Sequence, residues 1–365
     1  MQVLLLSDSD SPHTLRWARS LLERGIGIGI FSIHKPNLEL YSDFPQIKLF
    51  SLNISRQIQS KTETSLSKLI YLKAISEVKK AIAKFNPDIV HAHYASSYGF
   101  LGAMVNFHPL FISVWGSDVF RFPKYSLIHK IIFRFAISKA DKIFSTSRVM
   151  KTEIEKYTDK KIFVIPFGID IERFKPIQVE KVSNDDCIII GTIKTLETRY
   201  GIEYLIRAFA ILKKKNLEQK IKLLICGKGT LLDKLKILTS ELGIQDDVIF
   251  AGYINHDQIQ YYHNKLDIYV APSLEESFGV AVLEASACNK PVVVSNVGGL
   301  PEVVDQGVTG FIVEPRNPIE LADAIQKLII NSSLRVEMGR KGRDKVIQEY
   351  EWKKSVSSMA EHYKI

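Results

Sequence analysis

The amino-acid sequence predicts an α/β protein with two domains, each built on a parallel sheet. The chain has 365 residues, which is too long for one ordinary hydrophobic core and suits two domains. Short apolar runs alternate along it with amphipathic segments of helical period, as in sheets whose strands are joined by crossover helices. Hydrophobic residues make up 46% and charged residues 24%, which indicates a globular protein.

The first strand, helix and strand lie at the N-terminus. Residues 2–7 are an apolar run typical of a buried strand. Residues 14–24 have the period of a helix that Gly25 ends, and residues 26–33 are a second apolar run. This order starts a parallel sheet. The alternation continues with a helix at 65–85 and strands at 87–94, 111–115 and 141–147.

A second sheet is predicted in the C-terminal half. Residues 177–186 are polar and are expected to form a loop before an apolar strand that begins at residue 187. The elements expected after it are helices at 202–214, 231–242, 318–330 and 334–350, with strands that start near 221 and 248.

The stretch 271–311 joins apolar runs, glycine turns and carboxylates. Residues 267–272 read as a short buried strand closed by a proline, residues 273–279 as a turn, and residues 278–288 as a helix. Asn289 ends that helix before the next strand begins. A loop that runs into a helix N-terminus at the carboxyl edge of a parallel sheet is where such folds bind phosphorylated ligands.

Two glutamates flank this corner of the chain. Glu276 lies in the turn, and Glu284 lies about one turn inside the helix. The helical rise separates them by roughly 7–8 Å along the axis, so they can reach different parts of one extended ligand. Ionised carboxylates are strong acceptors for sugar or ribose hydroxyls. The alternative is that these carboxylates, with Glu275, only complement the helix dipole.

The whole stretch resembles the retaining glycosyltransferases of the GT-B fold, specifically glycosyltransferase family 4. The motif elements are Glu276 and Glu284 with seven residues between them, Pro291, Gly298-Gly299, Pro301-Glu302 and Thr309-Gly310-Phe311. The resemblance implies that Glu276 contacts the transferred sugar and Glu284 the ribose. It implies that Ser277, Phe278 and Gly279 offer backbone groups to sugar and phosphate. Asn289 replaces the usual glycine, and Asn is the next best residue for a left-handed helix end.

The resemblance also implies a domain plan. Residues 1–168 would form a Rossmann-like acceptor domain, and residues 169–349 a Rossmann-like domain for the nucleotide-sugar donor. The two would face each other across a cleft. Residues 350–365 would form a terminal helix that crosses back to the N-terminal domain. The boundary falls in the segment 162–176, which is similar to the connector of the family.

Further donor residues follow from the same resemblance. Lys194 and Arg199, on a loop before a helix, correspond to the cations that relatives present to the donor diphosphate. Gly252 and Tyr253 end a strand that looks like the edge where the nucleotide base binds.

The acceptor side is expected at the carboxyl edge of the first sheet. His13 ends the loop after the first strand, and His93 and Tyr94 end the strand that resembles the Asp-Ile-Val-His-x-His strand of the family. Trp115 and Asp118 stand in a Trp-Gly-Ser-Asp segment where many relatives read His-Gly-x-Asp. A tryptophan neither titrates nor accepts a hydrogen bond, so this position departs from the family.

Three patterns suggest other chemistry, and we give each little weight. Asp8-Ser9-Asp10 and His91-x-His93 have metal-ligand spacing, but the first belongs to a different fold and the second has no third ligand nearby. Glycines 25, 27 and 29 follow a helix and do not open one, unlike a dinucleotide fingerprint. We therefore expect no metal and no cofactor besides the nucleotide-sugar substrate. Cys187, Cys226 and Cys288 show no Cys-x-x-Cys pair and are expected to be reduced.

The net charge of +9 is concentrated in the N-terminal half. Residues 1–170 hold 23 Lys or Arg against 14 Asp or Glu, and residues 171–365 hold 26 of each. The excess lies at 56–84 and 121–161, where aromatic residues interleave with cations. Anionic lipid is the partner we favour for this surface. Nucleic acid is disfavoured because no recognition module is present, and a merely solvated basic face stays open.

The N-terminus lacks a basic segment typical of a signal peptide, and no window holds 18 consecutive apolar residues. We expect a cytoplasmic protein that binds peripherally to the inner face of the membrane.

The predicted activity is metal-independent, retaining transfer of a hexosyl-type sugar from a nucleotide diphosphate sugar to a saccharide or lipid-linked acceptor. Cell-surface polysaccharide or glycolipid synthesis is the expected setting. The alternative is a catalytically weak partner subunit that binds sugar nucleotides. A nicotinamide-dependent enzyme is a third class, but the chain lacks the required glycine turn after its first strand.

Overall fold

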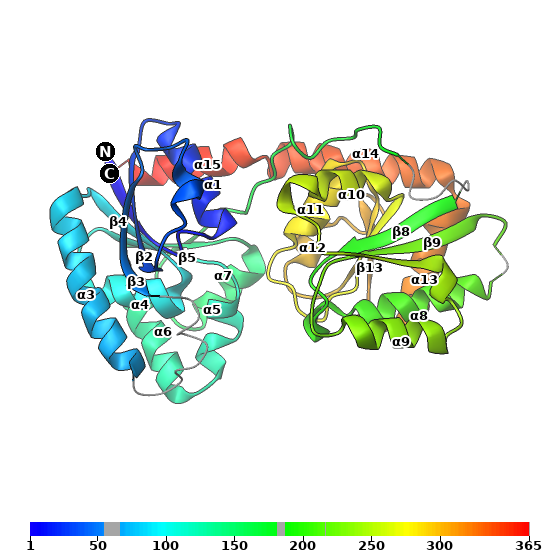
Figure 1. The fold of residues 1–365 in the computed structure, drawn as a ribbon, viewed down its shortest axis with the longest axis horizontal. Coiled ribbons are helices and arrows are strands. Elements are labelled where there is room, and N and C mark those ends of the chain that lie inside the picture. Colours follow the sequence, from blue (N-terminus) through cyan, green and yellow to red (C-terminus); the bar gives the residue numbers. More distant parts are fainter. Residues whose placement is uncertain (55–65, 181–186, 216, 365) are drawn as a thin grey trace. The chain divides into compact units, whose positions relative to one another are not determined.

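The computed structural model describes residues 1–54, 66–180, 187–215 and 217–364 (Figure 1). In the helix that begins at residue 66, side chains are described from Lys73 onward. These residues form two compact units. The first contains Met1–Pro166 and Val356–Ile365, and the second contains Phe167–Ser355. The basic stretch 56–84 lies partly outside the described residues, as do positions 181–186 of the expected loop.

The first unit is built on a seven-stranded sheet in the order β3-β2-β1-β4-β5-β6-β7, and every strand pair is parallel. This confirms the predicted α/β fold. Its strands are β1 (Gln2–Leu6), β2 (Gly27–His34), β3 (Lys48–Ile54), β4 (Ile89–His93), β5 (Leu110–Val114), β6 (Lys142–Ser145) and β7 (Ile162–Val164). Its helices include α1 (Pro12–Leu22), α3 (Leu66–Phe85), α4 (Phe100–Val105), α5 (Ser117–Phe120), α6 (Leu127–Lys139) and α7 (Arg148–Glu155).

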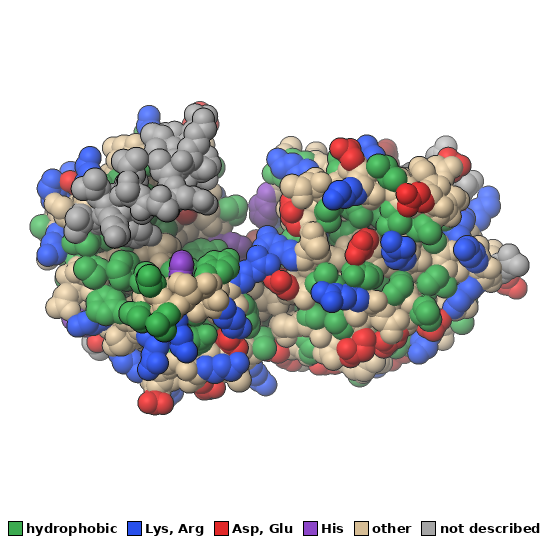
Figure 2. Space-filling model, turned by 90° about the horizontal axis from the view of Figure 1, so that it is seen from below, with side chains coloured by type: hydrophobic (Ala, Val, Ile, Leu, Met, Phe, Trp, Pro, Cys, Tyr) green, Lys and Arg blue, Asp and Glu red, His purple; other side chains and the backbone are tan. Residues whose placement is uncertain are grey.

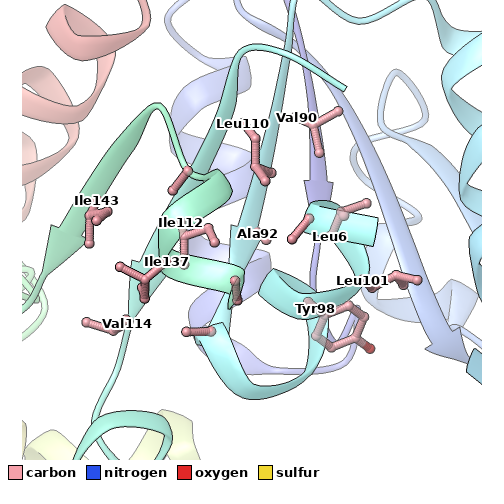
Figure 3. Close-up of a cluster of buried hydrophobic side chains, with 14 of the residues drawn as sticks. Leu6, Val90, Ala92, Tyr98, Leu101, Leu110, Ile112, Val114, Ile137 and Ile143 are labelled. Carbon is pink, nitrogen blue, oxygen red and sulfur yellow. The ribbon is translucent and has the colours of Figure 1, made fainter. Parts of the chain in front are cut away.

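The core of the first unit lies between the central strands and the helices that cover them (Figure 3). Ala92 of β4 and Ile112 of β5 are fully buried, because strands of a parallel sheet are covered on both faces. Ile137 of α6 packs into the same cluster. The carboxyl ends of β1, β4 and β5 therefore lie side by side on a rigid sheet.

The second unit contains a six-stranded sheet in the order β10-β9-β8-β11-β12-β13, again with every pair parallel. Its strands are β8 (Cys187–Ile193), β9 (Lys220–Cys226), β10 (Val248–Gly252), β11 (Ile268–Ala271), β12 (Val292–Ser295) and β13 (Gly310–Val313). Its helices are α8 (Ile202–Lys213), α9 (Leu232–Glu241), α10 (Ile259–Lys265), α11 (Val280–Ala287), α12 (Leu300–Val303), α13 (Pro318–Ile330) and α14 (Ser332–Glu349).

The core of the second unit follows the same physical rule as that of the first. Ile190, Val270 and Val293, from three neighbouring strands, are fully buried. Phe209 of α8 and Ile325 of α13 pack against them. Both units are thus Rossmann-like layers in which the carboxyl edge of the sheet is free to carry loops.

The chain ends in α15 (Trp352–Tyr363), whose last residues belong to the first unit. The Tyr363 hydroxyl lies 2.6 Å from Nδ1 of His91 in β4, and its ring stacks on Phe111 of β5. The Lys142 ammonium donates to the carbonyl of His362. Within the ranges that the structure describes, no helix is long and apolar enough to cross a membrane.

Candidate functional site

The loop between β11 and α11 carries Glu276 and is held by its backbone. Its last residue, Gly279, has a φ of +109°, which only glycine adopts readily. The amide of Gly299 donates to the carbonyl of Glu276 at 3.1 Å. A side chain on Gly298 would collide with that same carbonyl. The Gly-Gly motif therefore lets two loops touch and fixes the position of Glu276.

Lys194 forms an ion pair with Glu276. The Lys194 ammonium lies 2.7 Å from Oε2 of Glu276, and both side chains are largely buried. The two groups attract each other by charge, but their geometry is not that of a hydrogen bond. The loop of Lys194 is tied to the Glu276 loop, because the carbonyl of Arg199 accepts the amides of Leu274 and Glu275 at 2.8 and 3.1 Å. Two of the predicted donor residues thus meet directly.

Arg199 lies on the exposed side of the same loop. The Arg199 guanidinium stands 4.8 Å from the ring centroid of Tyr200, and the Lys194 ammonium stands 4.6 Å from the same centroid. Tyr200 therefore contacts both of the cations that are predicted to bind the diphosphate.

Glu284 lies within α11 and is almost buried. Nε2 of His263, a fully buried residue of α10, is 3.4 Å from Oε2 of Glu284. The imidazole is enclosed by the rings of Phe174 and Tyr269, so it holds the carboxylate in one orientation. Sequence reasoning missed His263, because nothing in the local sequence around it marks a site.

The expected base-binding edge contains a cavity of about 180 Å³ beside the ends of β8, β9 and β10. Tyr253 and Lys194 line it, together with Lys228, whose ammonium lies 4.4 Å from the Tyr253 ring centroid. Lys228 was not predicted, although it stands in a Gly-x-Gly turn after β9. The carbonyl of Gly252 accepts the amide of Gly227 at 2.7 Å, so Gly252 shapes the rim of the cavity.

Ser277 and Phe278 complete the loop before α11. Phe278 is buried, and its ring meets Phe167 and Tyr350 edge-on within the second unit. Its side chain therefore anchors the loop, and its backbone is what the site can use. Ser277 is half-buried.

The first unit gathers the other predicted residues around Trp115. The Trp115 ring lies 4.4 Å from the ring of His93, 5.1 Å from that of Tyr94 and 5.7 Å from that of His13, measured between centroids. Trp115 and His93 are buried, whereas His13 is exposed. These residues come from the ends of β4 and β5 and the start of α1, so the sheet edge brings them together.

Burial keeps the imidazoles of His91 and His93 uncharged. Burial lowers the pKa of His91 to about 3, and burial with the nearby His91 and His13 lowers the pKa of His93 well below its usual value. Nδ1 of His93 lies 3.0 Å from the Ser7 hydroxyl. Neutral imidazoles can exchange hydrogen bonds with a ligand without a net charge.

The Asp118 carboxylate accepts hydrogen bonds from backbone amides next to these rings. One carboxylate oxygen accepts the amide of Ala95, and the other accepts the amides of Trp115 and Gly116, at 2.8 to 3.1 Å. Burial raises the pKa of the Asp118 carboxyl, although these amide hydrogen bonds oppose the rise. Asp118 holds the ends of β4 and β5 together, including Tyr94, which has a φ of +68°. Burial raises the pKa of the Tyr94 hydroxyl to about 12.

The residues with metal-ligand spacing have other partners. Oδ1 of Asp8 accepts the amide of Asp10, and Oδ1 of Asp10 accepts the amide of Asn37. Both ring nitrogens of His91 have hydrogen-bonding partners, the second being Ser113 at 2.8 Å. Across the described ranges no three His, Cys, Asp or Glu side chains gather as metal ligands would.

Each unit matches a family model. Residues 2–147 match the model described as Glycosyl transferase 4-like, and residues 174–345 match Glycosyl transferases group 1. The chain belongs to the group 1 glycosyltransferases. Among curated relatives, a D-inositol 3-phosphate glycosyltransferase of Corynebacterium jeikeium is 33% identical over 236 residues, covering 60% of this chain and 56% of the relative. The chain spans about half the length of most of the curated relatives it matches.

A second curated relative is a GDP-mannose-dependent alpha-(1-6)-phosphatidylinositol monomannoside mannosyltransferase of Mycobacterium tuberculosis. It is 29% identical over 210 residues, covering 54% of each chain. Among solved structures, a sucrose-phosphate synthase of Thermosynechococcus elongatus superposes with a TM-score of 0.83 at 21% identity, covering 100% of this chain and 98% of the other. Anabaena HepE in complex with UDP-glucose superposes with a TM-score of 0.77 at 19% identity and 99% coverage of both chains. These likenesses identify the fold as GT-B.

Proposed function

We propose that this group 1 glycosyltransferase transfers a sugar, with retention at the anomeric carbon, from a nucleotide diphosphate sugar to a saccharide or lipid-linked acceptor. The observation that carries the proposal is the Lys194–Glu276 ion pair, which lies beside the N-terminus of α11 and next to a cavity lined by Tyr253. A cation, a carboxylate and a cavity at one sheet edge match the diphosphate, sugar and base of such a donor.

The proposed chemistry rests on charge placement. When the bond to the diphosphate breaks, negative charge grows on the leaving phosphate and positive charge on the anomeric carbon. Lys194 and Arg199 would stabilise the leaving group, and Glu276 would orient the sugar through its hydroxyls. His263 would hold Glu284 toward the ribose. An acceptor hydroxyl attacks on the face that the diphosphate leaves, and the leaving phosphate takes up the hydroxyl proton. This retains the configuration and needs neither an enzyme nucleophile nor a metal ion.

The relatives support the acceptor class in the proposal. One is a glycosyltransferase of D-inositol 3-phosphate, and another is a mannosyltransferase of phosphatidylinositol monomannoside. Both acceptors are hydroxyl-rich, and the second is a lipid. We therefore place the reaction in polysaccharide or glycolipid synthesis.

A thermal-shift screen of UDP-, GDP- and ADP-sugars tests the proposal. A donor that binds only the folded state stabilises it by about 2.7 kcal/mol at a hundred times its Kd, so at least one donor should raise the Tm clearly. The double variant Lys194→Ala with Arg199→Ala should lose most of the shift. If no nucleotide sugar raises the Tm of the wild-type protein, the proposed donor site is wrong.

A catalytically weak subunit that binds sugar nucleotides is the second candidate. The observation in its favour is Trp115, which is packed against His93 and stands where the family resemblance implies histidine. Slow hydrolysis of the bound donor by the purified protein, without acceptor, would favour the enzyme. Donor binding with no hydrolysis and no transfer to any offered acceptor would favour the subunit.

A further inference from the structure

Four apolar side chains project from the start of α6 and the turn before it. Tyr125, Leu127, Ile128 and Ile131, which we call the α6 tip, are between 57% and 72% exposed. They fall within seven consecutive residues, whereas the other exposed large apolar side chains of the described residues are scattered along the chain. Single exposed apolar residues need no explanation, but a cluster on one helix end does.

The segment that carries the α6 tip has a positive net charge. Between Asp118 and Asp141 the sequence holds five Lys or Arg and no Asp or Glu. Lys130 and Arg134 are exposed and stand three and seven residues after Leu127, so they share its side of the helix. Figure 2 views the molecule from the side on which α6 lies in Figure 1, and it shows hydrophobic side chains gathered on the first unit with Lys and Arg beside them.

The fold presents the α6 tip in a fixed position. The opposite side of α6 buries Phe133, Ala136 and Ile137 completely, and Ile137 lies in the core between the central strands and the helices (Figure 3). The Ser126 hydroxyl caps the helix by accepting the amide of His129 and lies 2.7 Å from its Nδ1. The exposed apolar residues are therefore held outward by a well-packed helix.

The ring of His129 secures the turn before the helix. It meets the ring of Phe122 at 4.8 Å and that of Tyr125 at 5.7 Å, both edge-on. The aromatic ring of Tyr125 is thus kept at the helix start, where it adds a hydroxyl to an otherwise apolar group. Tyrosine with one apolar and one polar end is typical of membrane interfaces.

We propose that the α6 tip inserts into the head-group region of an anionic membrane, with Lys130 and Arg134 in contact with the lipid phosphates. A cationic apolar helix end is complementary to an anionic lipid surface. Lysine and arginine stems lie along apolar surface while their charges stay at the phosphates. Four side chains are too few for a stable protein partner, whose interface takes about 20–30 residues a side.

The connection between β5 and β6 links this surface to the candidate acceptor residues. Trp115 and Asp118 open the connection and the α6 tip follows within it. Docking through the α6 tip would therefore hold the Trp115 edge of the same unit near the lipid surface, where a lipid-linked acceptor resides. Docking does not require the proposed reaction, so a loss of docking and a loss of transfer can be separated.

Vesicle flotation tests the proposal with the full chain. The probes are vesicles of phosphatidylcholine alone and of phosphatidylcholine mixed with phosphatidylglycerol, each at low and high salt. We expect flotation with the anionic vesicles at low salt and a clear decrease at high salt, because salt screens the lysine and arginine charges. A wild-type protein that stays at the bottom with anionic vesicles at low salt would overturn the proposal.

Two variants separate the apolar and the charged contributions. The triple change Leu127→Gln, Ile128→Gln and Ile131→Gln should lower the partition coefficient about a hundredfold, since three inserted side chains are lost. The double change Lys130→Gln and Arg134→Gln should lower it about tenfold, and only on anionic vesicles. All five residues are largely exposed, so the Tm of both variants should match that of the wild type.

The matched control removes the same kind of surface elsewhere. Ile237→Gln, Ile330→Gln and Val336→Gln change three side chains of the second unit that are 58% to 70% exposed. This variant should float like the wild type, and an equal loss would show that the binding is nonspecific. If the wild-type protein is a dimer in solution and the α6-tip triple variant is a monomer, the surface binds a second copy of the chain and the proposal is overturned. Transfer to a soluble acceptor should be unchanged in the α6-tip variants.

Discussion

The two candidate sites of this protein use different chemistry at equivalent places. Both lie on loops at the carboxyl edge of a parallel sheet. In the second unit the central contact is between full charges, Lys194 and Glu276, on loops that hold each other by backbone hydrogen bonds. In the first unit the central contacts are between rings around Trp115, and burial lowers the pKa of His93. One site can bind by charge, and the other by shape and neutral hydrogen bonds.

The largest expected effect is the loss of turnover when Glu276 is replaced. Glu276→Gln removes the charge that would orient the sugar during bond breaking, and turnover should fall about a hundredfold or more. Nucleotide affinity, measured by calorimetry, should change only a few-fold. The neighbouring Glu275→Gln is the matched control, because Glu275 is exposed and should leave turnover near wild type. An active Glu276→Gln enzyme would contradict the assigned role.

The next effect separates the diphosphate contacts from the rest of the donor site. Lys194→Ala combined with Arg199→Ala should weaken binding of the nucleoside diphosphate about tenfold to a hundredfold, since charge-assisted hydrogen bonds are lost. Isothermal calorimetry measures the change. Lys214→Ala, an exposed lysine at the end of α8, serves as the control. Unchanged affinity in the double variant would refute the assignment.

The buried imidazoles make the first unit sensitive to acid. The pKa of His91 is about 3 in the folded state and roughly 6.5 in the unfolded chain, so only the unfolded chain takes up the proton between these values. Above pH 6.5 the His91 imidazole does not change the free energy of unfolding. Below pH 6.5 this free energy decreases as the pH falls, and the loss due to His91 is about 2 kcal/mol at pH 5. Urea unfolding followed by tryptophan fluorescence at pH 7 and 5 measures the loss. In His91→Asn the pH dependence should be smaller, and an unaltered dependence would contradict the cause.

A smaller effect is expected from His263, which positions Glu284. His263→Phe should raise the KM for the donor several-fold and change kcat less. The Glu284 carboxylate remains in the site, but it loses the partner that fixes its orientation. His263→Gln should restore part of the affinity, since its amide can also donate to Glu284. The exposed His256→Gln is the control. Equal KM values for His263→Phe and the wild type would show that Glu284 needs no such partner.

The smallest effect concerns the choice of acceptor. Trp115→His introduces the histidine that the family resemblance implies at this position and removes the ring packed on His93 and Tyr94. The KM for the acceptor should change about several-fold, while donor hydrolysis without acceptor stays the same. Trp115→Phe keeps an aromatic ring and should lie between the two. A change in donor hydrolysis instead would place Trp115 at the donor.

The difference between the sites also explains what the sequence could predict. The two parallel sheets followed from short apolar strands that alternate with helices, although β3 and β7 were not predicted. Lys194 and Glu276 were both assigned to the donor site, but only the fold shows that they form an ion pair. His263 and Lys228 were missed, because their contacts with Glu284 and Tyr253 are created by packing between elements distant in sequence. Asp118 was predicted at the acceptor edge, but only the fold shows that both its oxygens are engaged by backbone amides.

The Lys194–Glu276 ion pair has a consequence for selectivity. A lysine that already lies 2.7 Å from a carboxylate is a poor trap for free phosphate, because the ion would have to displace Glu276 and leave its largely buried charge without a partner. A nucleotide sugar brings phosphate for the lysine and hydroxyls for the glutamate in one molecule. The proposed donor site would therefore require both halves of its ligand at once, which would protect it from the abundant inorganic anions of a cell.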